Sequence, residues 1–424
     1  MVSAPKGMQR GDLMRQFCSY AALACVLSWS CLGSGADART VRFRVVWSLT
    51  ENPGDGRYIY AGLINAKGIL YGTTSYGGNE GCYEVMGCGT FFSVNPATGV
   101  ATWLHRFGAN YANEGATPAA GLIKVGSTLY GTTMTGGANG CHTRQGSAGC
   151  GAVYSWDLKT GTYAAPYALP ADGSAGIWPV AALVDVGPVL YGTTSAGGNP
   201  GCHLDEGCGT VFSLNTATGA VALVYSFKGG NDGGTPTSGL INVGGILYGT
   251  TWGGTNATGT AFSLDPATGN ETVLHSFLGG SDGANPAAGL LDVDGTLYGT
   301  TSGGGAAGDG TVFTVNPTTG AESVVYSFKG GNDGAQPLAG LIRLGGKLYG
   351  TTSQGGGSSG LGTVFSLDLK TGAEKVVHSF QPVYSFDRVG IGPEAGLISV
   401  GGTLYGTTSS GGDHGAGTVF AVTP

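Results

Sequence analysis

Two residues at equivalent places in a repeated sequence are candidates for binding or acid/base chemistry. Tyr60 and Glu394 stand just before two of the repeats, where the other repeats have small or apolar residues, namely Ala119, Val180, Thr237, Ala287 and Leu338. Arg57 and Arg388 are near them in sequence. An acid, a phenol and a cation together are suited to gripping a sugar or to general acid/base catalysis. A solvated salt bridge at the base of a loop is the simpler alternative.

More polar residues with catalytic potential gather around three cysteine pairs: Glu80, Tyr83, Glu84, His142, Arg144, His203 and Asp205. Paired carboxylates serve glycoside cleavage, and His with Tyr or Arg serves β-elimination from a uronic acid. The candidate catalytic residues are therefore Glu394, Tyr60, His203, Glu80 and Glu84. The others, with the two arginines, are candidates for ligand binding. Loop-tip charges are commonly only solvated, and this alternative stays open for each of them.

Three further features carry weaker signals. Trp252 replaces the serine of the Thr-Thr-Ser repeats, so it is either a stacking platform for a sugar or a packing residue. His414, in a short loop of the last repeat, is a ligand-binding candidate with the same alternative. Three Gly-Gly-(Asn/Ser)-Asp-Gly loops are weak candidates for calcium binding, because their aspartates offer oxygen ligands: Asp232, Asp282 and Asp333. The same loops are also ordinary turn formers.

The elements that must position these residues repeat seven times. Each repeat contains Leu-Tyr-Gly-Thr-Thr, with its tyrosine at 71, 130, 191, 248, 298, 349 or 405. Within residues 239–286, four β-like runs are separated by turn signals such as Gly-Gly and Asp-Pro-Ala-Thr-Gly. We name the four predicted strands a, b, c and d in chain order. Each repeat is predicted to be a four-stranded antiparallel meander.

Meanders at a period near 50 residues are typical of β-propeller blades. Six repeats are complete, whereas the seventh ends after its strand c. Residues 41–49 match the pattern of the missing strand d. We therefore predict an all-β, seven-bladed propeller in which the N-terminal strand completes the C-terminal blade, with residues 39–424 as one domain. A parallel β-solenoid is the alternative.

Residues 1–38 are predicted to be a secretory signal peptide, because basic residues precede an apolar stretch and small residues follow it. A transmembrane anchor is the alternative. The chain has a formal net charge of −7 and lacks a basic stripe, which argues against nucleic acid and anionic membranes as partners. We expect a secreted or periplasmic monomer without membrane insertion once the signal is removed.

If the protein is exported, the six cysteines that follow residue 38 are in an oxidising compartment. They form pairs in the b-to-c loops of the first three repeats: Cys82 with Cys88, Cys141 with Cys150, and Cys202 with Cys208. The even count and matched placement predict three local disulfides in an oxidising compartment. Zinc is the alternative, but the pairs lack the close Cys-x-x-Cys spacing.

Strand alternation also predicts which face is functional. The a-to-b and c-to-d turns share one face and are uniformly short, whereas the longer b-to-c and d-to-a loops share the other. Binding or catalysis is expected on the loop-rich face. The predicted site lies in the sector from blade 7 to blade 3. This sector contains the disulfide-bearing loops predicted for blades 1–3 and an insertion at 381–391 before blade 7.

The motifs Gly-Leu-Ile-x-Val-Gly-Gly-x-Leu-Tyr-Gly-Thr-Thr, Gly-Thr-Val-Phe-Ser-Leu-Asp-Pro-x-Thr-Gly and Val-His-Ser-Phe resemble the GloVer (Gloeo-Verruco) tandem repeats of exported bacterial proteins. The resemblance covers nearly all of residues 41–424. It implies an exported scaffold and supplies no catalytic residues. Two functions follow: recognition of an extracellular glycan or cell-surface partner, or degradation of a polysaccharide by a lyase or glycoside hydrolase. No cofactor is expected to be required, and calcium stays open.

Overall fold

The computed structural model describes residues 41–50, 52, 54–78, 82, 86–108, 114–137, 141, 149–199, 202, 206–253, 258–381 and 389–424. Each repeat forms one four-stranded antiparallel sheet, as predicted from the alternation of β-rich runs with glycine turns. In the described part of the chain, no helix is long and apolar enough to cross a membrane.

The first four blades follow the chain in order. Blade 1 contains β3 (Ile64–Ala66), β4 (Ile69–Thr74), β6 (Thr90–Val94) and β7 (Ala101–Arg106). Blade 2 contains β8 (Ile123–Val125), β9 (Thr128–Thr133), β10 (Ala152–Asp157) and β11 (Thr162–Ala168). Blade 3 contains β12 (Val184–Val186), β13 (Val189–Thr194), β14 (Thr210–Asn215) and β15 (Val221–Ser226). Blade 4 contains β16 (Ile241–Val243), β17 (Ile246–Thr251), β18 (Thr260–Asp265) and β19 (Asn270–Ser276).

Blades 5 to 7 complete the set. Blade 5 contains β20 (Leu291–Val293), β21 (Thr296–Thr301), β22 (Thr311–Val315) and β23 (Glu322–Ser327). Blade 6 contains β24 (Ile342–Leu344), β25 (Lys347–Thr352), β26 (Thr363–Asp368) and β27 (Glu374–Ser379). Blade 7 contains β28 (Ile398–Val400), β29 (Thr403–Thr408), β30 (Thr418–Thr423) and β1 (Arg42–Ser48). The smaller elements are β2 (Gly56–Arg57), β5 (Tyr76–Gly77) and the 3-10 helices η2 (Gly230–Asp232) and η4 (Gly280–Asp282).

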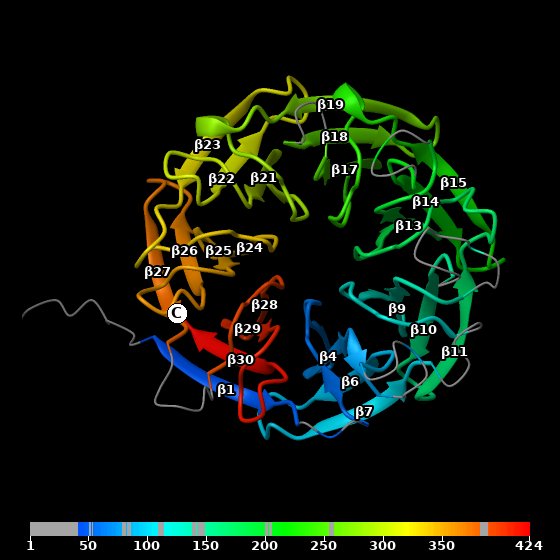
Figure 1. The fold of residues 1–424 in the computed structure, drawn as a ribbon, viewed down its shortest axis with the longest axis horizontal. Coiled ribbons are helices and arrows are strands. Elements are labelled where there is room, and N and C mark those ends of the chain that lie inside the picture. Colours follow the sequence, from blue (N-terminus) through cyan, green and yellow to red (C-terminus); the bar gives the residue numbers. More distant parts are fainter. Residues whose placement is uncertain are drawn as a thin grey trace, which may run out of the picture. The chain divides into compact units, whose positions relative to one another are not determined.

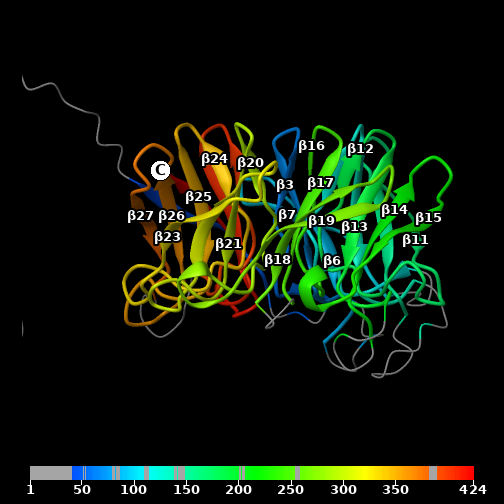
Figure 2. The ribbon, with the colours of Figure 1, turned by 90° about the horizontal axis from the view of Figure 1, so that it is seen from above.

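The seven sheets form a ring with strand a toward the centre and strand d at the rim (Figure 1). Blade 7 is built from both ends of the chain, because β1 pairs antiparallel with β30 and Arg42 lies opposite Thr423. The predicted seven-bladed propeller is therefore confirmed, and the solenoid alternative is wrong. Seen from the side, the short hairpin turns lie on one face of the ring and the longer connections lie on the other (Figure 2).

The first threonine of each Leu-Tyr-Gly-Thr-Thr segment ties its blade to the next. In six of the seven blades its hydroxyl donates to a backbone carbonyl that precedes strand a of the following blade, at 3.0 to 3.4 Å. One of these bonds, from Thr407 to Ala61 at 3.2 Å, joins blade 7 to blade 1. Thr73 is the exception, since its buried hydroxyl has no hydrogen-bond partner. The ring closure therefore combines strand pairing with a side-chain hydrogen bond.

Apolar packing reinforces the same interfaces. The phenylalanine after strand d of one blade meets the strand c aromatic of the next edge to face, as Phe328 meets Phe365 with ring centroids 5.0 Å apart. The glycine of Leu-Tyr-Gly-Thr-Thr makes room for this ring. A β-carbon on Gly350 would lie 2.6 Å from Cζ of Phe365, which is closer than a β-carbon contact allows. Each blade thus needs a large ring and a glycine at facing positions.

A β-bulge interrupts the pairing of strands c and d in every blade. In blade 4, for example, Ala261 pairs with His275 and the adjacent Phe262 pairs with Val273. The bulge gives strand d one extra residue and a stronger local twist. The alternation of residue types along the sequence does not reveal it.

Replacing Thr407 with valine should lower the free energy of unfolding by about 1 kcal/mol, because the substitution removes one interblade hydrogen bond at nearly constant volume. Thr73→Val is the matched control, since the Thr73 hydroxyl has no partner to lose. Denaturant titrations of both variants would measure the difference. Equal losses in the two variants would contradict a stabilising role for the Thr407 hydrogen bond.

Candidate functional site

A circle of residues with left-handed backbone leads into the seven strands a on the loop-rich face. It comprises Tyr58, Thr117, Trp178, Thr235, Asn285, Gln336 and Gly392, with φ between 53° and 64°. Six of these are not glycine, and such a conformation costs on the order of 1 kcal/mol for each. Backbone strain of this kind is found preferentially at functional sites. The circle thus directs attention to this mouth of the ring.

Hydrogen bonds hold each residue of this circle in place from both sides. The Tyr58 N–H donates to the carbonyl of Ala416 in blade 7 at 3.0 Å, and the Tyr58 carbonyl accepts from the Ser75 N–H of blade 1 at 3.0 Å. The corresponding pair of bonds recurs in the other six blades. The mouth is therefore a rigid layer that is bonded to two blades at every position.

Tyr60 and Glu394 lie in this layer, two residues after Tyr58 and Gly392 respectively. Glu394 is partly buried, and its carboxylate accepts a hydrogen bond from Ser409 Oγ at 3.0 Å. Burial raises the pKa of Glu394, although the Ser409 bond opposes the shift. Burial also raises the pKa of Tyr60, and the charge of the nearby Glu394 raises it further. The ring thus brings together two residues that are far apart in the sequence.

Two more tyrosines extend the cluster. The rings of Tyr58 and Tyr60 stack with centroids 6.3 Å apart and an interplanar angle of 10°, and Tyr76 meets Tyr58 edge to face at 5.9 Å. The small sheet of β2 and β5 positions them, because Arg57 pairs with Tyr76. Tyr60 is 39% exposed. We call Tyr58, Tyr60, Tyr76, Glu394 and Ser409 the tyrosine cluster.

Sequence reasoning missed three members of the tyrosine cluster: Tyr58, Tyr76 and Ser409. One signal was available for Tyr58. The residue after it is Ile59, whereas the other six blades have proline at this position. Tyr76 and Ser409 carry no such signal, because they follow Thr-Thr segments that look ordinary in every repeat.

Two tryptophans lie on the same layer farther around the ring. Trp252 is 39% exposed, and its carbonyl accepts from the Asn285 side-chain amide at 3.3 Å. Trp178, which sequence reasoning also missed, is partly buried and packs on the apolar cluster that contains Cys141 and Cys150. Trp252 belongs to blade 4, just beyond the predicted sector of blades 7 to 3.

The remaining predicted residues are distributed unevenly. Arg57 lies in β2, and His414 is exposed in the b-to-c turn of blade 7. The rest lie outside the described residues: Glu80, Tyr83, Glu84, His142, Arg144, His203, Asp205 and Arg388. Their predicted roles stay predictions.

The three predicted disulfides are confirmed: Cys82–Cys88, Cys141–Cys150 and Cys202–Cys208, with Cα–Cα distances of 5.2, 5.3 and 4.8 Å. Each also supports the mouth of the ring. The carbonyl of Cys150, for example, accepts the Trp178 N–H of the next blade at 3.1 Å, and those of Cys88 and Cys208 accept the equivalent N–H groups. The disulfides thus fix three of the seven contacts that hold the circle of left-handed residues.

The aspartates predicted as weak calcium ligands take part in hydrogen bonds at the outer rim. Asp232 accepts from the Lys228 N–H at 2.7 Å and from the Tyr225 hydroxyl at 2.6 Å, and Asp333 makes the equivalent bonds in blade 5. A glutamate of the next blade, Glu271 or Glu374, reaches the same tyrosine hydroxyl at 3.4 to 3.5 Å. These bonds account for both aspartates without an ion.

Between blades 4 and 5, a histidine replaces the tyrosine. The ligand atoms of His275, Asp282 and Glu322 all lie within 4.8 Å of one another, and His275 Nε2 is 3.2 Å from the Asp282 carboxylate. A nitrogen and two carboxylates are a donor set that suits a divalent transition metal. The same atoms also form an ordinary charge and hydrogen-bond network, as their tyrosine counterparts do. The His378 ring stacks on Phe43 at 3.7 Å. The His105 ring stacks on Tyr163 at 3.9 Å, and His105 Nε2 lies 3.9 Å from the Glu114 carboxylate.

The rim glutamates should make stability depend on pH. Burial, with the adjacent aspartate second, raises the pKa of Glu271, Glu322 and Glu374 from 4.5 to about 7. A raised carboxyl pKa gives stability that is complete below the unfolded pKa and is lost as the pH rises through 7. Burial lowers the pKa of His105 and His378, so these two groups reduce stability only as the pH falls below 6.5.

We therefore expect the melting temperature to fall between pH 6.5 and pH 8. The loss should be well below about 1.4 kcal/mol per pKa unit for each glutamate, because all three side chains are partly solvated. The triple variant Glu271→Gln, Glu322→Gln and Glu374→Gln should remove most of the fall, since glutamine imitates the protonated acid. Calorimetry at both pH values measures this. If the melting temperature of the triple variant falls with pH as steeply as that of the wild type, groups other than these glutamates cause the fall.

Comparison with known proteins agrees with this architecture. A family profile described as the Gloeobacter/Verrucomicrobia repeat matches residues 140–293 and 201–420, which together exceed half of the chain. Among curated proteins, none matches this sequence significantly.

Two solved structures are similar in fold. The extracellular domain of a protein described as a hybrid two-component system from B. thetaiotaomicron has a TM-score of 0.54 at 11% identity, over 89% of this chain and 39% of that one. This chain therefore spans about two fifths of that protein's length. An oligogalacturonate lyase in complex with manganese has a TM-score of 0.51 at 12% identity, over 91% and 96% of the two chains. At such identities the likeness shows the fold alone.

Proposed function

Because the chain belongs to the Gloeobacter/Verrucomicrobia repeat family and its repeats form a closed propeller, we propose that it is an exported protein that binds an extracellular glycan at the tyrosine cluster. The observation that supports this most is the stacked pair of Tyr58 and Tyr60 beside the Glu394 carboxylate. Aromatic side chains offer an apolar face and a polar edge. A sugar ring presents the matching combination of C–H faces and hydroxyl groups.

The polar groups of the cluster are suited to hydroxyl recognition. The Tyr60 hydroxyl is protonated at neutral pH, since burial raises its pKa above the ordinary 10.0, and it is available to donate a hydrogen bond to a sugar. Glu394 accepts through its carboxylate and is held by Ser409. A few oriented polar groups around an apolar surface are typical of small-ligand sites.

Export is supported by two observations. The three disulfides belong in an oxidising compartment, and residues 1–38 have the composition of a signal peptide. The structural similarity to an extracellular domain agrees with this location. We therefore assign the protein to the periplasm or the extracellular space.

Polysaccharide cleavage is the second candidate function. Tyr60 and Glu394 form an acid and phenol pair with raised pKa values, which is a combination used in proton transfer. An oligogalacturonate lyase shares the fold, so uronic-acid polymers belong among the substrates to be tested. In this alternative, the same cluster both binds the glycan and transfers the proton.

Affinity electrophoresis on a panel of polysaccharides, polygalacturonate included, tests the binding proposal. We expect retention on at least one, and Tyr60→Ala should weaken it about fivefold, since an aromatic contact contributes roughly 1 kcal/mol and one decade equals 1.4 kcal/mol. Leu338→Ala is the matched control, because Leu338 holds the same place in blade 6. If Tyr60→Ala binds like the wild type, the tyrosine cluster is not the site.

Incubation with the retained polysaccharide separates binding from catalysis. New reducing ends, with or without the absorbance of unsaturated uronates, would establish a lyase or a hydrolase. In that case Glu394→Gln should abolish product, whereas retention should only weaken, because the Tyr58 and Tyr60 rings are still present. Binding without product under all conditions, with and without calcium or manganese, assigns a recognition protein.

A further inference from the structure

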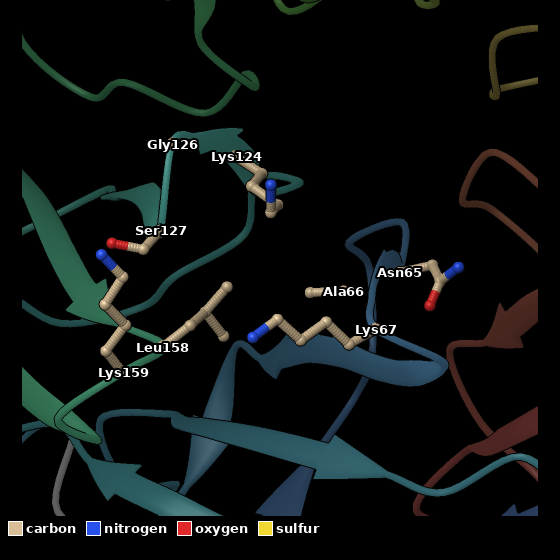
Figure 3. Close-up of a pocket in the computed structure, with 8 residues that line it drawn as sticks. All are labelled: Asn65, Ala66, Lys67, Lys124, Gly126, Ser127, Leu158 and Lys159. Atoms are coloured by element: carbon tan, nitrogen blue, oxygen red, sulfur yellow. The ribbon is translucent and has the colours of Figure 1, made fainter.

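A hollow on the short-turn face carries an unexpected concentration of positive charge. It has a volume of about 550 Å³, lies between blades 1 and 2 and is lined by Asn65, Ala66, Lys67, Lys124, Gly126, Ser127, Leu158 and Lys159. Figure 3 shows Lys67 reaching from the blade 1 turn toward Leu158, with Lys124 and Lys159 contributed by blade 2. The proposed glycan site lies on the opposite face. This hollow is therefore a separate feature of the ring.

We propose that this hollow binds a small ligand with two or more oxyanion groups, such as phosphates or sulfates. Three lysines converge there in a protein whose formal net charge is −7. Among the described residues, no carboxylate forms an ion pair with any of the three ammonium groups. Asp157 is the nearby acid that reduces the local charge. Hydrogen bonds from the backbone N–H groups of Thr160 and Lys159 lower the pKa of Asp157, and the charge of Lys159 adds a smaller effect.

The backbone conformation of Lys67 supports a functional role. Lys67 is the first residue of the β3–β4 turn and has φ of 55°. Five of the other six blades have glycine there, with φ between 59° and 62°, and Asp294 is the remaining case. Only glycine adopts this conformation without a steric cost. A lysine is therefore retained where the turn itself favours glycine, and backbone strain of this kind marks functional positions.

The other repeats show that the turns do not need these lysines. The place of Lys124 is taken by Asp185 in blade 3 and by Asp292 in blade 5. Arg343 holds it in blade 6, where Asp294 neutralises the guanidinium at 3.0 Å. The place of Lys159 is taken by alanine in blades 1, 3 and 4. Lys67 and Lys124 thus lie where blades 1 and 2 meet without an ion pair among the described residues, whereas Arg343 of blade 6 is paired with Asp294.

The floor of the hollow is held in shape by its own backbone. The Leu158 N–H donates to the Ser127 carbonyl at 2.8 Å, which joins the two turns of blade 2. The Gly68 N–H donates to Asn65 Oδ1 at 3.0 Å, which closes the turn that carries Lys67. Lys67 and Lys159 therefore extend from ordered turns, and Lys124 extends from β8, around a small apolar surface that includes Leu158. A multivalent anion would draw the three ammonium groups together, and salt would weaken its binding.

Calorimetric titration of the protein with inorganic pyrophosphate and, separately, with a trisulfated disaccharide tests the proposal at low ionic strength. We expect one of the two to bind and its affinity to fall as salt is added. Preference for pyrophosphate assigns a phosphorylated ligand, and preference for the disaccharide assigns a sulfated sugar. If neither probe binds, the proposal is wrong.

Lys67→Gly is the decisive variant. It should reduce the affinity at least tenfold and raise the melting temperature, because glycine relieves the backbone strain that the lysine imposes. Lys124→Gln should reduce the affinity to a similar extent without that stabilisation. Lys370→Gln is the matched control, since Lys370 holds the place of Lys159 in blade 6, and it should bind like the wild type. Equal affinity in the wild type and the Lys67→Gly and Lys124→Gln variants would overturn the assignment.

Discussion

The contact between one blade and the next is the constraint on which the other features of this protein depend. At most interfaces it combines a threonine hydroxyl bonded to the next blade's carbonyl with a phenylalanine packed edge to face on the next blade's aromatic ring. A sheet of four strands is marginal by itself, and seven of them are stable because each covers its neighbour. The same contact closes the ring, since blade 7 meets blade 1 through Thr407 and Ala61.

The interface also determines where function can develop. The inner strands are held by packing, whereas many turn and loop residues on the two faces contact solvent. On one face, the left-handed residues form a rigid circle, and the tyrosine cluster lies beside it between blades 7 and 1, where Tyr60 and Glu394 replace the small or apolar residues that precede strand a in the other blades. On the other face, three lysines break the pattern of glycine, alanine and acidic residues between blades 1 and 2. In both places the informative residues are those that differ from the repeat.

The ionisable groups at the outer rim and those at the mouth of the ring also differ in their arrangement. At the outer rim, tyrosine or histidine pairs with aspartate and glutamate across neighbouring blades in three consecutive interfaces, and the burial of these groups raises the pKa of each glutamate. Such networks lose part of their stabilising effect as the glutamate gives up its proton. At the mouth, Glu394 is the carboxyl among the described residues whose pKa burial raises, and it lies beside the tyrosine rings. The first arrangement recurs and is structural, and the second occurs once and is the better candidate for function.

Many features of this protein could be predicted from its sequence alone. The strand and turn pattern of each repeat, the seven blades, the split blade and the three disulfides all depend on local patterns or on short loops, so they could be predicted without coordinates. Tyr60 and Glu394 were found because they depart from a repeated pattern. The tertiary structure alone decided that Tyr58, Tyr76 and Ser409 join them, and that Lys67 and Lys159 share one hollow. The strand d bulges and the left-handed circle also needed coordinates. The reason is that ring closure and the packing of neighbouring blades set which side chains meet, and distances across the ring leave no periodic trace in the sequence.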